Sequence, residues 1–80
     1  MIDVKVRAYA TLRRYLPDLP MGESMVLSLS EGSTVADVLN RLGIPHAEVR
    51  RCFVNGLHQE PDHVLQGNDE LALFPPIGGG

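Results

Sequence analysis

The stretch STVADVLNRLGIP, residues 33–45, is the clearest amphipathic helix in the sequence. Ser33 or Thr34 can cap its N-terminus, and Asp37 lies near the positive end of the helix dipole. Gly43 can adopt the left-handed conformation that ends a helix. Four apolar side chains recur at helical spacing: Val35, Val38, Leu39 and Leu42. A helix with one apolar face must pack that face against another element, which we expect to be a sheet.

Two stretches before the helix predict β-strands. Apolar residues alternate with more polar ones over residues 2–8 and again over 25–29, which is the period of a strand with one buried face. The two strands are expected to pair as an antiparallel hairpin. The segment between them, 10–24, is interrupted by two prolines and a glycine, so it should form a helical turn or two and then a loop.

More strand signals follow the helix. Residues 51–59 predict a third strand and a short fourth, separated by the tight-turn dipeptide Asn55-Gly56. After a turn at Gly67-Asn68, the apolar run 71–74 predicts a last strand that lies inside the sheet and is covered on both faces. The order fits an α+β fold in which one main helix packs on a mixed sheet of four or five strands.

Length and composition predict one small folded domain. The chain has 80 residues, 44% of them hydrophobic and 21% charged, which allows a modest core but no deep catalytic cavity. Its single cysteine cannot form an internal disulfide, and the N-terminus lacks signal-peptide features, so we expect a cytoplasmic protein. No stretch approaches the roughly 20 apolar residues of a transmembrane helix. A formal charge of −3 argues against nucleic acid as a partner.

Three stretches resemble the small sulfur-carrier proteins of the MoaD/ThiS family, and within it the small subunits of molybdopterin synthase. They are YATLRRYLP (9–17), FVNG (53–56) and LQGNDELALFPPIGGG (65–80). The resemblance covers essentially the whole chain. It implies the ubiquitin-like β-grasp fold, with a domain over residues 1–74 and an extended, flexible C-terminal Gly-Gly tail over 75–80.

The chain departs from the family pattern at two places. Gly67-Asn68-Asp69 stands where the family usually has an Asp-Gly-Asp turn, and this change keeps residues that accept positive φ. The variable position before the final glycine pair is a third glycine, Gly78, which loosens the tail without removing a reactive group. Neither departure alters the sulfur-carrier interpretation.

The resemblance gives the C-terminal glycine a chemical role. The α-carboxylate of Gly80 is ionised at neutral pH and can attack a phosphoryl centre. The family's carriers are adenylated at this position by an activating enzyme related to those of ubiquitin, and a persulfide-bearing donor protein then converts the adenylate to a thiocarboxylate. The chain has no nucleotide-binding motif, so the activating partner would bind the ATP, and no cofactor is expected on the chain itself.

In the molybdopterin type, the resemblance implies that the tail enters the synthase large subunit and delivers sulfur to a pyranopterin precursor. The catalytic residues would lie on that subunit, so this chain alone is not an enzyme, and a hetero-tetramer is expected. Pro75 and Pro76 hold the stem of the tail extended. Gly79 and Gly80 lack Cβ atoms and can therefore thread a narrow channel.

Docking to these partners requires an apolar patch beside the tail, for which the family uses sheet residues. Tyr9 and Phe74 are the candidates here, with Pro75, Pro76 and Ile77 as the stem that also contacts the partner. Alternation along the first strand places Tyr9 opposite the expected core face. The alternative is that both aromatic residues are ordinary sheet residues.

Other reactive side chains are expected to be structural. Cys52 could relay sulfur, but without a neighbouring His or Lys pattern it is predicted to be a buried strand residue. The histidines His46, His58 and His63 match no metal-ligand spacing, so no metal site is predicted.

Other functions remain compatible with the sequence. A carrier for thiamine or another pathway is one, although the Phe-Pro-Pro stem and the length of 80 residues favour the molybdopterin type. A ubiquitin-like protein modifier is another, and the single lysine, Lys5, would give it few sites for chain formation. A plain binding module would keep its activity without Gly79 and Gly80.

Overall fold

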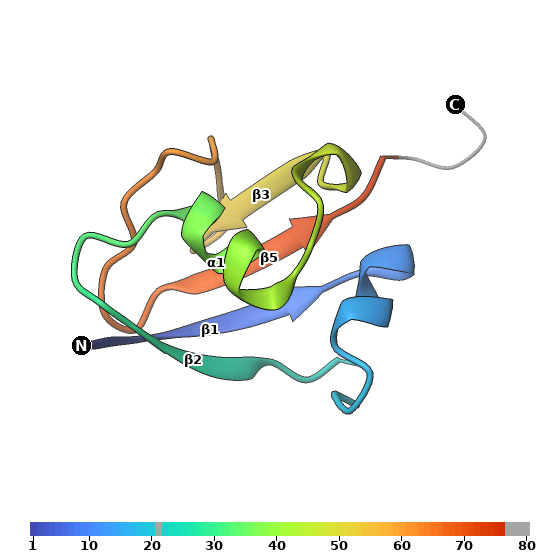
Figure 1. The fold of residues 1–80 in the computed structure, drawn as a ribbon, viewed down its shortest axis with the longest axis horizontal. Helices are drawn as coiled ribbons and strands as arrows, with labels where there is room; N and C mark the ends of the chain where they lie inside the picture. Colours follow the sequence, from blue (N-terminus) through green and yellow to red (C-terminus); the bar gives the residue numbers. More distant parts are fainter. Residues whose placement is uncertain (21, 77–80) are drawn as a thin grey trace.

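The structure is a computed structural model of the chain, and it describes residues 1–20 and 22–76. The strands are β1 (Ile2–Ala8), β2 (Met25–Leu29), β3 (Arg51–Val54), β4 (Leu57–Gln59) and β5 (Glu70–Phe74). They form one mixed sheet in the spatial order β2-β1-β5-β3-β4 (Figure 1). The central pair, β1 and β5, is parallel, and the other neighbouring pairs are antiparallel. The predicted α+β arrangement is confirmed, with five strands.

Helix α1 (Val35–Leu42) begins and ends where the sequence predicts. Thr34 is the N-cap: its hydroxyl accepts a hydrogen bond from the Asp37 N–H at 3.3 Å, and the Asp37 carboxylate accepts one from the Thr34 N–H at 2.9 Å. This reciprocal pair is a capping box, which satisfies two backbone donors that a helix otherwise leaves open. Gly43 ends the helix with a φ of 71°, a conformation that costs glycine little.

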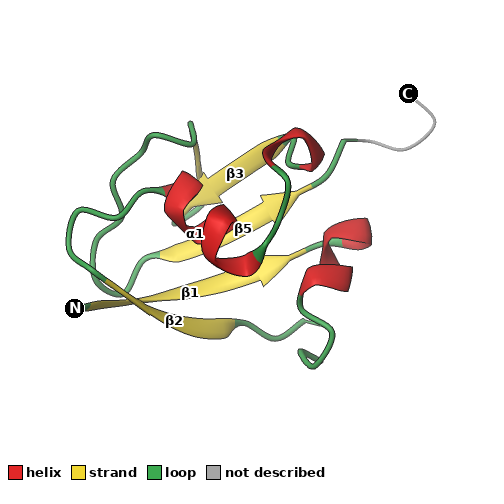
Figure 2. Cartoon of the chain, in the orientation of Figure 1, coloured by secondary structure: helices red, strands yellow, loops and turns green. Residues whose placement is uncertain are grey.

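The core lies between α1 and one face of the sheet, as the crossing of helix and strands in Figure 2 shows. Alternate strand residues point into it, and so do three helix residues. The side chains less than 2% exposed are Val4, Val6, Leu12, Val35, Val38, Leu39, Leu65, Leu71 and Leu73. Each such residue contributes about 1.5–3 kcal/mol relative to an exposed position. Sheet and helix therefore stabilise each other.

Strand β5 lies inside the sheet, between β1 and β3, as predicted. The expectation that both of its faces are covered is wrong. Leu71 and Leu73 are buried under α1, whereas Ala72 and Phe74 on the opposite face are only half-buried. The apolar run did not distinguish these cases, because Ala72 and Phe74 are apolar although they lie on the face of the sheet away from α1. We call this second side of the sheet the open face.

The segments that connect the strands and the helix form short 3₁₀ helices and tight turns. The segment after β1 forms the short 3₁₀ helix η1 (Ala10–Tyr15), which matches the predicted helical turn or two, and a second one, η2 (His46–Glu48), follows α1. Asn55 and Gly56 have φ values of 52° and 84°, as a tight hairpin turn of this type requires. No helix in the described ranges has the length and apolar character needed to cross a membrane.

Candidate partner-binding face and tail stem

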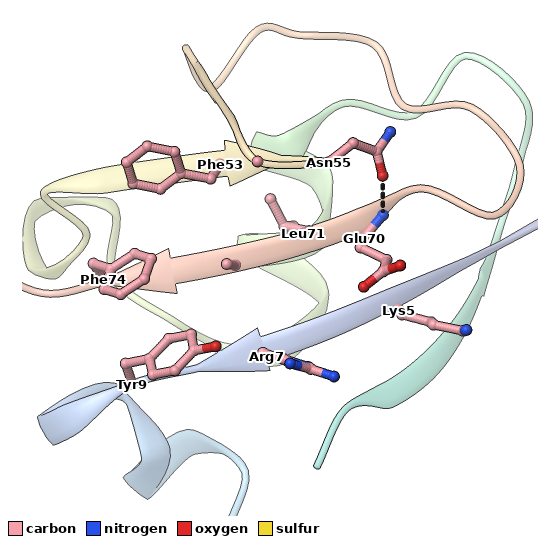
Figure 3. A pocket seen from close by; sticks show the side chains of 10 residues that line it. Lys5, Arg7, Tyr9, Phe53, Asn55, Glu70, Leu71 and Phe74 are labelled. Carbon is pink, nitrogen blue, oxygen red and sulfur yellow. Dashed lines mark hydrogen bonds between the residues drawn. The ribbon is translucent and has the colours of Figure 1, made fainter. Parts of the chain in front are cut away.

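Four rings gather on the open face near the C-terminal end of β5, and Figure 3 shows three of them, Tyr9, Phe53 and Phe74. Tyr9 and Phe74 stack with ring centroids 4.5 Å apart and planes within 1° of parallel. Phe53 meets Phe74 edge to face at 5.5 Å, and His58 meets Phe53 edge to face at 5.7 Å. We call Tyr9, Phe53, Phe74 and His58 the aromatic shelf. Aromatic pairs in these geometries add about 0.5–1.5 kcal/mol beyond their buried area.

Strand register brings the shelf together. Phe53 of β3 lies opposite His58 of β4 and Ala72 of β5, and directly opposed residues of an antiparallel pair project on the same face. Tyr9 follows the last residue of β1, and its N–H donates to the carbonyl of Leu73 at 3.1 Å. Residues in or next to four different strands therefore share one surface.

The shelf borders a recess of about 540 Å³ on the open face. Polar and charged side chains line the rest of it: Arg7 beside Tyr9, and Lys5, Asn55 and Glu70 farther from the shelf. Tyr9 remains 37% exposed although it is stacked. A recess with aromatic walls at one end and charged groups at the other is suited to a partner surface that combines apolar and polar groups.

The stem of the tail leaves the sheet beside the shelf. The carbonyl of Phe74 accepts a hydrogen bond from the Arg50 N–H at 2.8 Å, which holds the last residue of β5 in place. Pro75 is half-buried and Pro76 is exposed, so the chain turns from sheet to solvent within two residues. The predicted tail residues Ile77, Gly78, Gly79 and Gly80 lie outside the described residues.

The two 3₁₀ helices are tied to each other. Glu48 of η2 pairs with the guanidinium of Arg14, and it also accepts a hydrogen bond from the Tyr15 hydroxyl at 2.8 Å. Arg14 is more than half exposed, so solvent screening limits what its ion pair contributes. The contact nevertheless links η1, which directly follows Tyr9, to the segment that precedes β3.

A polar network fixes the start of β5, and sequence reasoning missed it. Asp69 is only 8% exposed, and its carboxylate accepts hydrogen bonds from the Asn55 side-chain amide at 2.9 Å and the Gln66 N–H at 2.7 Å. The Asn55 side-chain carbonyl in turn accepts from the Glu70 N–H at 2.9 Å. The only sequence signal was the turn chemistry of Asn55 and Asp69, which predicts turns but not their contact.

The predicted environment of Cys52 is confirmed: it is a buried residue of β3. Burial raises the pKa of the Cys52 thiol above its ordinary value, and the nearby Glu60 carboxylate adds to the rise. The thiol is therefore protonated at neutral pH and is a poor nucleophile. Across residues 1–20 and 22–76, no three histidine, cysteine, aspartate or glutamate side chains gather closely enough to hold a metal ion.

The structure brings together two of the predicted partner-binding residues, Tyr9 and Phe74, and places Pro75 and Pro76 directly after them. Their role in binding stays a prediction. Phe53 and His58 were not predicted to join them. The alternation in residues 51–59 could have indicated that Phe53 points away from the buried Cys52, but the strand register needed to place it beside Phe74 cannot be read from the sequence.

Residues 1–78 match the family described as Mut7-C ubiquitin. The molybdopterin synthase sulfur carrier subunit of Arabidopsis thaliana is 34% identical over 87 residues, which cover 99% of this chain and 84% of that protein.

Solved structures agree on the fold. Small archaeal modifier protein 1 of Haloferax volcanii has a TM-score of 0.75 at 20% identity, and a putative molybdopterin converting factor subunit 1 of Pyrococcus furiosus has 0.73 at 23%. Each comparison covers 96% of this chain and 100% of the other. The fold is thus the ubiquitin-like β-grasp. With the sequence matches, this shows that the chain belongs to the ubiquitin-like family of Mut7-C and MoaD-like sulfur carriers.

Proposed function

We propose that this chain carries sulfur for molybdopterin biosynthesis as a C-terminal thiocarboxylate on Gly80. The observation that carries the proposal is the position of the aromatic shelf directly at the base of the tail: Phe74 is both the last residue of β5 and a member of the shelf. A partner that grips the shelf would receive the tail in a defined direction. The 34% identity to a molybdopterin synthase sulfur carrier subunit supports the pathway.

The chemistry requires an activated carboxylate. An oxygen of the Gly80 carboxylate attacks the α-phosphorus of ATP, pyrophosphate leaves, and an acyl-adenylate forms. The outer sulfur of the donor protein's persulfide then attacks the acyl carbon, AMP leaves, and the carrier is joined to the donor through an acyl disulfide. A second thiol, on the donor or on a thiol reductant, attacks the donor sulfur of that S–S bond; the Gly80 thiocarboxylate leaves, and the two thiol sulfurs end as a disulfide. ATP and the residues that position it belong to the activating enzyme in this proposal, and the chain itself holds no cofactor.

Partner contacts are assigned to the shelf and the stem. Tyr9 and Phe74 would supply the apolar contact, and Pro75, Pro76 and Ile77 would guide the tail into the partner. The partners are an activating enzyme related to those of ubiquitin, a sulfur donor and the synthase large subunit, all in the cytoplasm. The catalytic residues for sulfur delivery would lie on the large subunit.

Protein modification is the second candidate, because the fold is shared with a small archaeal modifier protein. A modifier would end with Gly80 in an isopeptide bond to a lysine of another protein. Both functions begin with adenylation of Gly80, so activation alone does not separate them.

The intact mass of the protein recovered from its native cells, without acid or reductant, tests the proposal. A fraction heavier by the difference between one sulfur and one oxygen atom, located at Gly80, is the expected result. Gly80 found only in linkage to lysines of other proteins would overturn the sulfur-carrier function in favour of the modifier.

A second experiment tests the pathway. Thiocarboxylated protein mixed with the molybdopterin synthase large subunit of the same cells should form a complex of larger mass on gel filtration and convert the pyranopterin precursor. Deletion of Gly79 and Gly80 is the control, which should abolish conversion while leaving the domain folded. An unchanged elution mass on addition of the large subunit would contradict the assignment to this pathway.

A further inference from the structure

The open face differs in charge from the rest of the molecule. The alternation of β1, β3 and β5 places three cations on it, Lys5, Arg7 and Arg51, against two carboxylates, Asp3 and Glu70. The residues of these three strands give the face a formal charge of +1, although the whole chain carries −3. The rest of the chain, which includes the buried Asp69, therefore sums to −4. The cations are concentrated where a partner is expected to dock.

Two of these cations flank the aromatic shelf. Arg7 of β1 lies opposite Ala72 in the sheet and lines the recess beside Tyr9 (Figure 3). Arg51 of β3 lies opposite Phe74. Since β5 runs between β1 and β3, the two arginines come from the two strands that flank β5. Phe74 thus has a guanidinium-bearing strand on either side.

Neither arginine is neutralised by a neighbour. Among the residues that the structure describes, no ion pair involves Arg7 or Arg51. Arg51 lines a second recess, of about 380 Å³, together with Arg50, His58 and Glu60, and the Glu60 carboxylate forms no ion pair with either arginine there. Glu70 and Lys5 line the far end of the first recess, away from the shelf. The positive charge next to the shelf is thus available to a ligand.

An apolar centre with arginines at its rim favours a partner surface that has an apolar centre surrounded by carboxylates. Guanidinium groups bind carboxylates in a planar, two-pronged geometry, and charges at an interface rim govern the association rate and partner choice more than total affinity. A nucleic acid would meet only +1 on this face and −4 elsewhere. A second copy docking open face to open face would bring two faces of the same net charge together.

We propose that Arg7 and Arg51 form a cationic rim that selects partner proteins whose docking surface surrounds an apolar projection with aspartate or glutamate side chains. The inference rests on the proposed function, because it assumes that a partner docks on the aromatic shelf. It goes beyond that function by assigning the chemistry of the partner surface and the two residues that recognise it.

The test compares three charge reversals: Arg7→Glu, Arg51→Glu and, as matched control, Arg41→Glu. Arg41 is exposed in the last turn of α1, on the opposite side of the sheet, and each substitution changes the net charge by the same amount. ATP–pyrophosphate exchange with the activating enzyme of the same cells is measured at low and high salt, giving kcat and KM for the carrier. All three positions are exposed, so all variants are expected to fold. Urea unfolding checks this.

The rim predicts that KM rises about tenfold at low salt for Arg7→Glu and Arg51→Glu, with kcat unchanged. The rise should shrink at high salt because ions screen rim charges. Arg41→Glu should stay within about twofold of wild type by the same argument.

Equal KM values for all three variants, with wild type active, would overturn the rim and leave the proposed function standing. Wild-type protein that supports no exchange at all would overturn the proposed function, and the rim with it. Sedimentation that shows a wild-type dimer lost in Arg7→Glu would also overturn the rim, because the face would then bind a second copy.

Discussion

Alternate residues of the five-residue strand β5 lie in different environments on its two faces. On the covered face, Leu71 and Leu73 are at most 1% exposed and pack in the core beneath α1. On the open face, Ala72 and Phe74 are half-buried and border a recess. Neighbouring residues of this strand therefore differ in role: one residue stabilises the core, and the next is exposed enough to contact a partner.

The largest effect should come from the covered face. Leu73→Ala removes a fully buried side chain at the centre of the sheet and should lower the free energy of unfolding by about 2–5 kcal/mol. A domain of this size has only about 4–12 kcal/mol in total, so the variant would be marginal. Urea unfolding followed by circular dichroism measures the loss. A loss below about 1 kcal/mol would show that the two faces do not differ in the way described.

The start of β5 sharpens the comparison, because there a polar network around the buried Asp69 stabilises the strand. Asn55→Ala removes the hydrogen bonds to Asp69 and Glu70, leaves the Asp69 carboxylate short of a donor, and should cost about 1–3 kcal/mol. Asn55→Gly is the matched control, since glycine accepts the φ of 52° while losing the same amide. The alanine variant should be the less stable of the two. Equal urea midpoints for both variants would show that backbone strain plays no part.

Phe74→Ala should weaken partner binding more than folding stability, the reverse of Leu73→Ala. It removes the stacked contact with Tyr9 and the edge contact with Phe53, so partner binding should weaken by about 1–2 kcal/mol, roughly tenfold in KM. Because the ring is only half-buried, the loss of folding stability should be smaller than for Leu73→Ala. Adenylation kinetics and urea unfolding on the same preparation measure both quantities. Unchanged KM would mean that the shelf is not a docking surface.

The smallest effect is a pH dependence from the covered face. The folded state raises the pKa of the Cys52 thiol above the ordinary value of 9.0, so above about pH 9 the unfolded chain loses this proton before the folded one does. Stability contributed by the protonated thiol is complete below that pH and declines as the pH rises through the folded pKa. Urea midpoints should therefore fall more steeply above pH 9 in the wild type than in Cys52→Ala. Parallel pH profiles would contradict this.

Much of the fold follows from local sequence patterns. The alternation of residues 2–8, the cap at Thr34 and the turn at Asn55-Gly56 each act over a few residues, and each was predicted where the structure has it. The coverage of β5 was predicted wrongly, because an apolar run shows what a strand can bury and not what lies over it. That Ala72 and Phe74 lie on the uncovered face could be known only from the position of α1.

The candidate site could be predicted only in part. Tyr9 and Phe74 followed from the family resemblance and from alternation, which places each on a face but not beside the other. Phe53 and His58 join them through strand register, and the contact between Asn55 and Asp69 depends on two turns meeting in space. Such contacts link residues far apart in sequence, and no local pattern specifies them.

The parallel pairing of β1 with β5 has a consequence for how the protein is made. Lys5 and Glu70 are register partners at the centre of the sheet, so during synthesis from the N-terminus β1 and β3 wait with unpaired edges until β5 is complete. Such non-local pairing makes folding late, cooperative and slow relative to a helical domain of the same size. Because β5 also ends in Phe74, the segment that completes the sheet is the one that leads into the tail stem, so Phe74 joins the aromatic shelf only when the domain is finished.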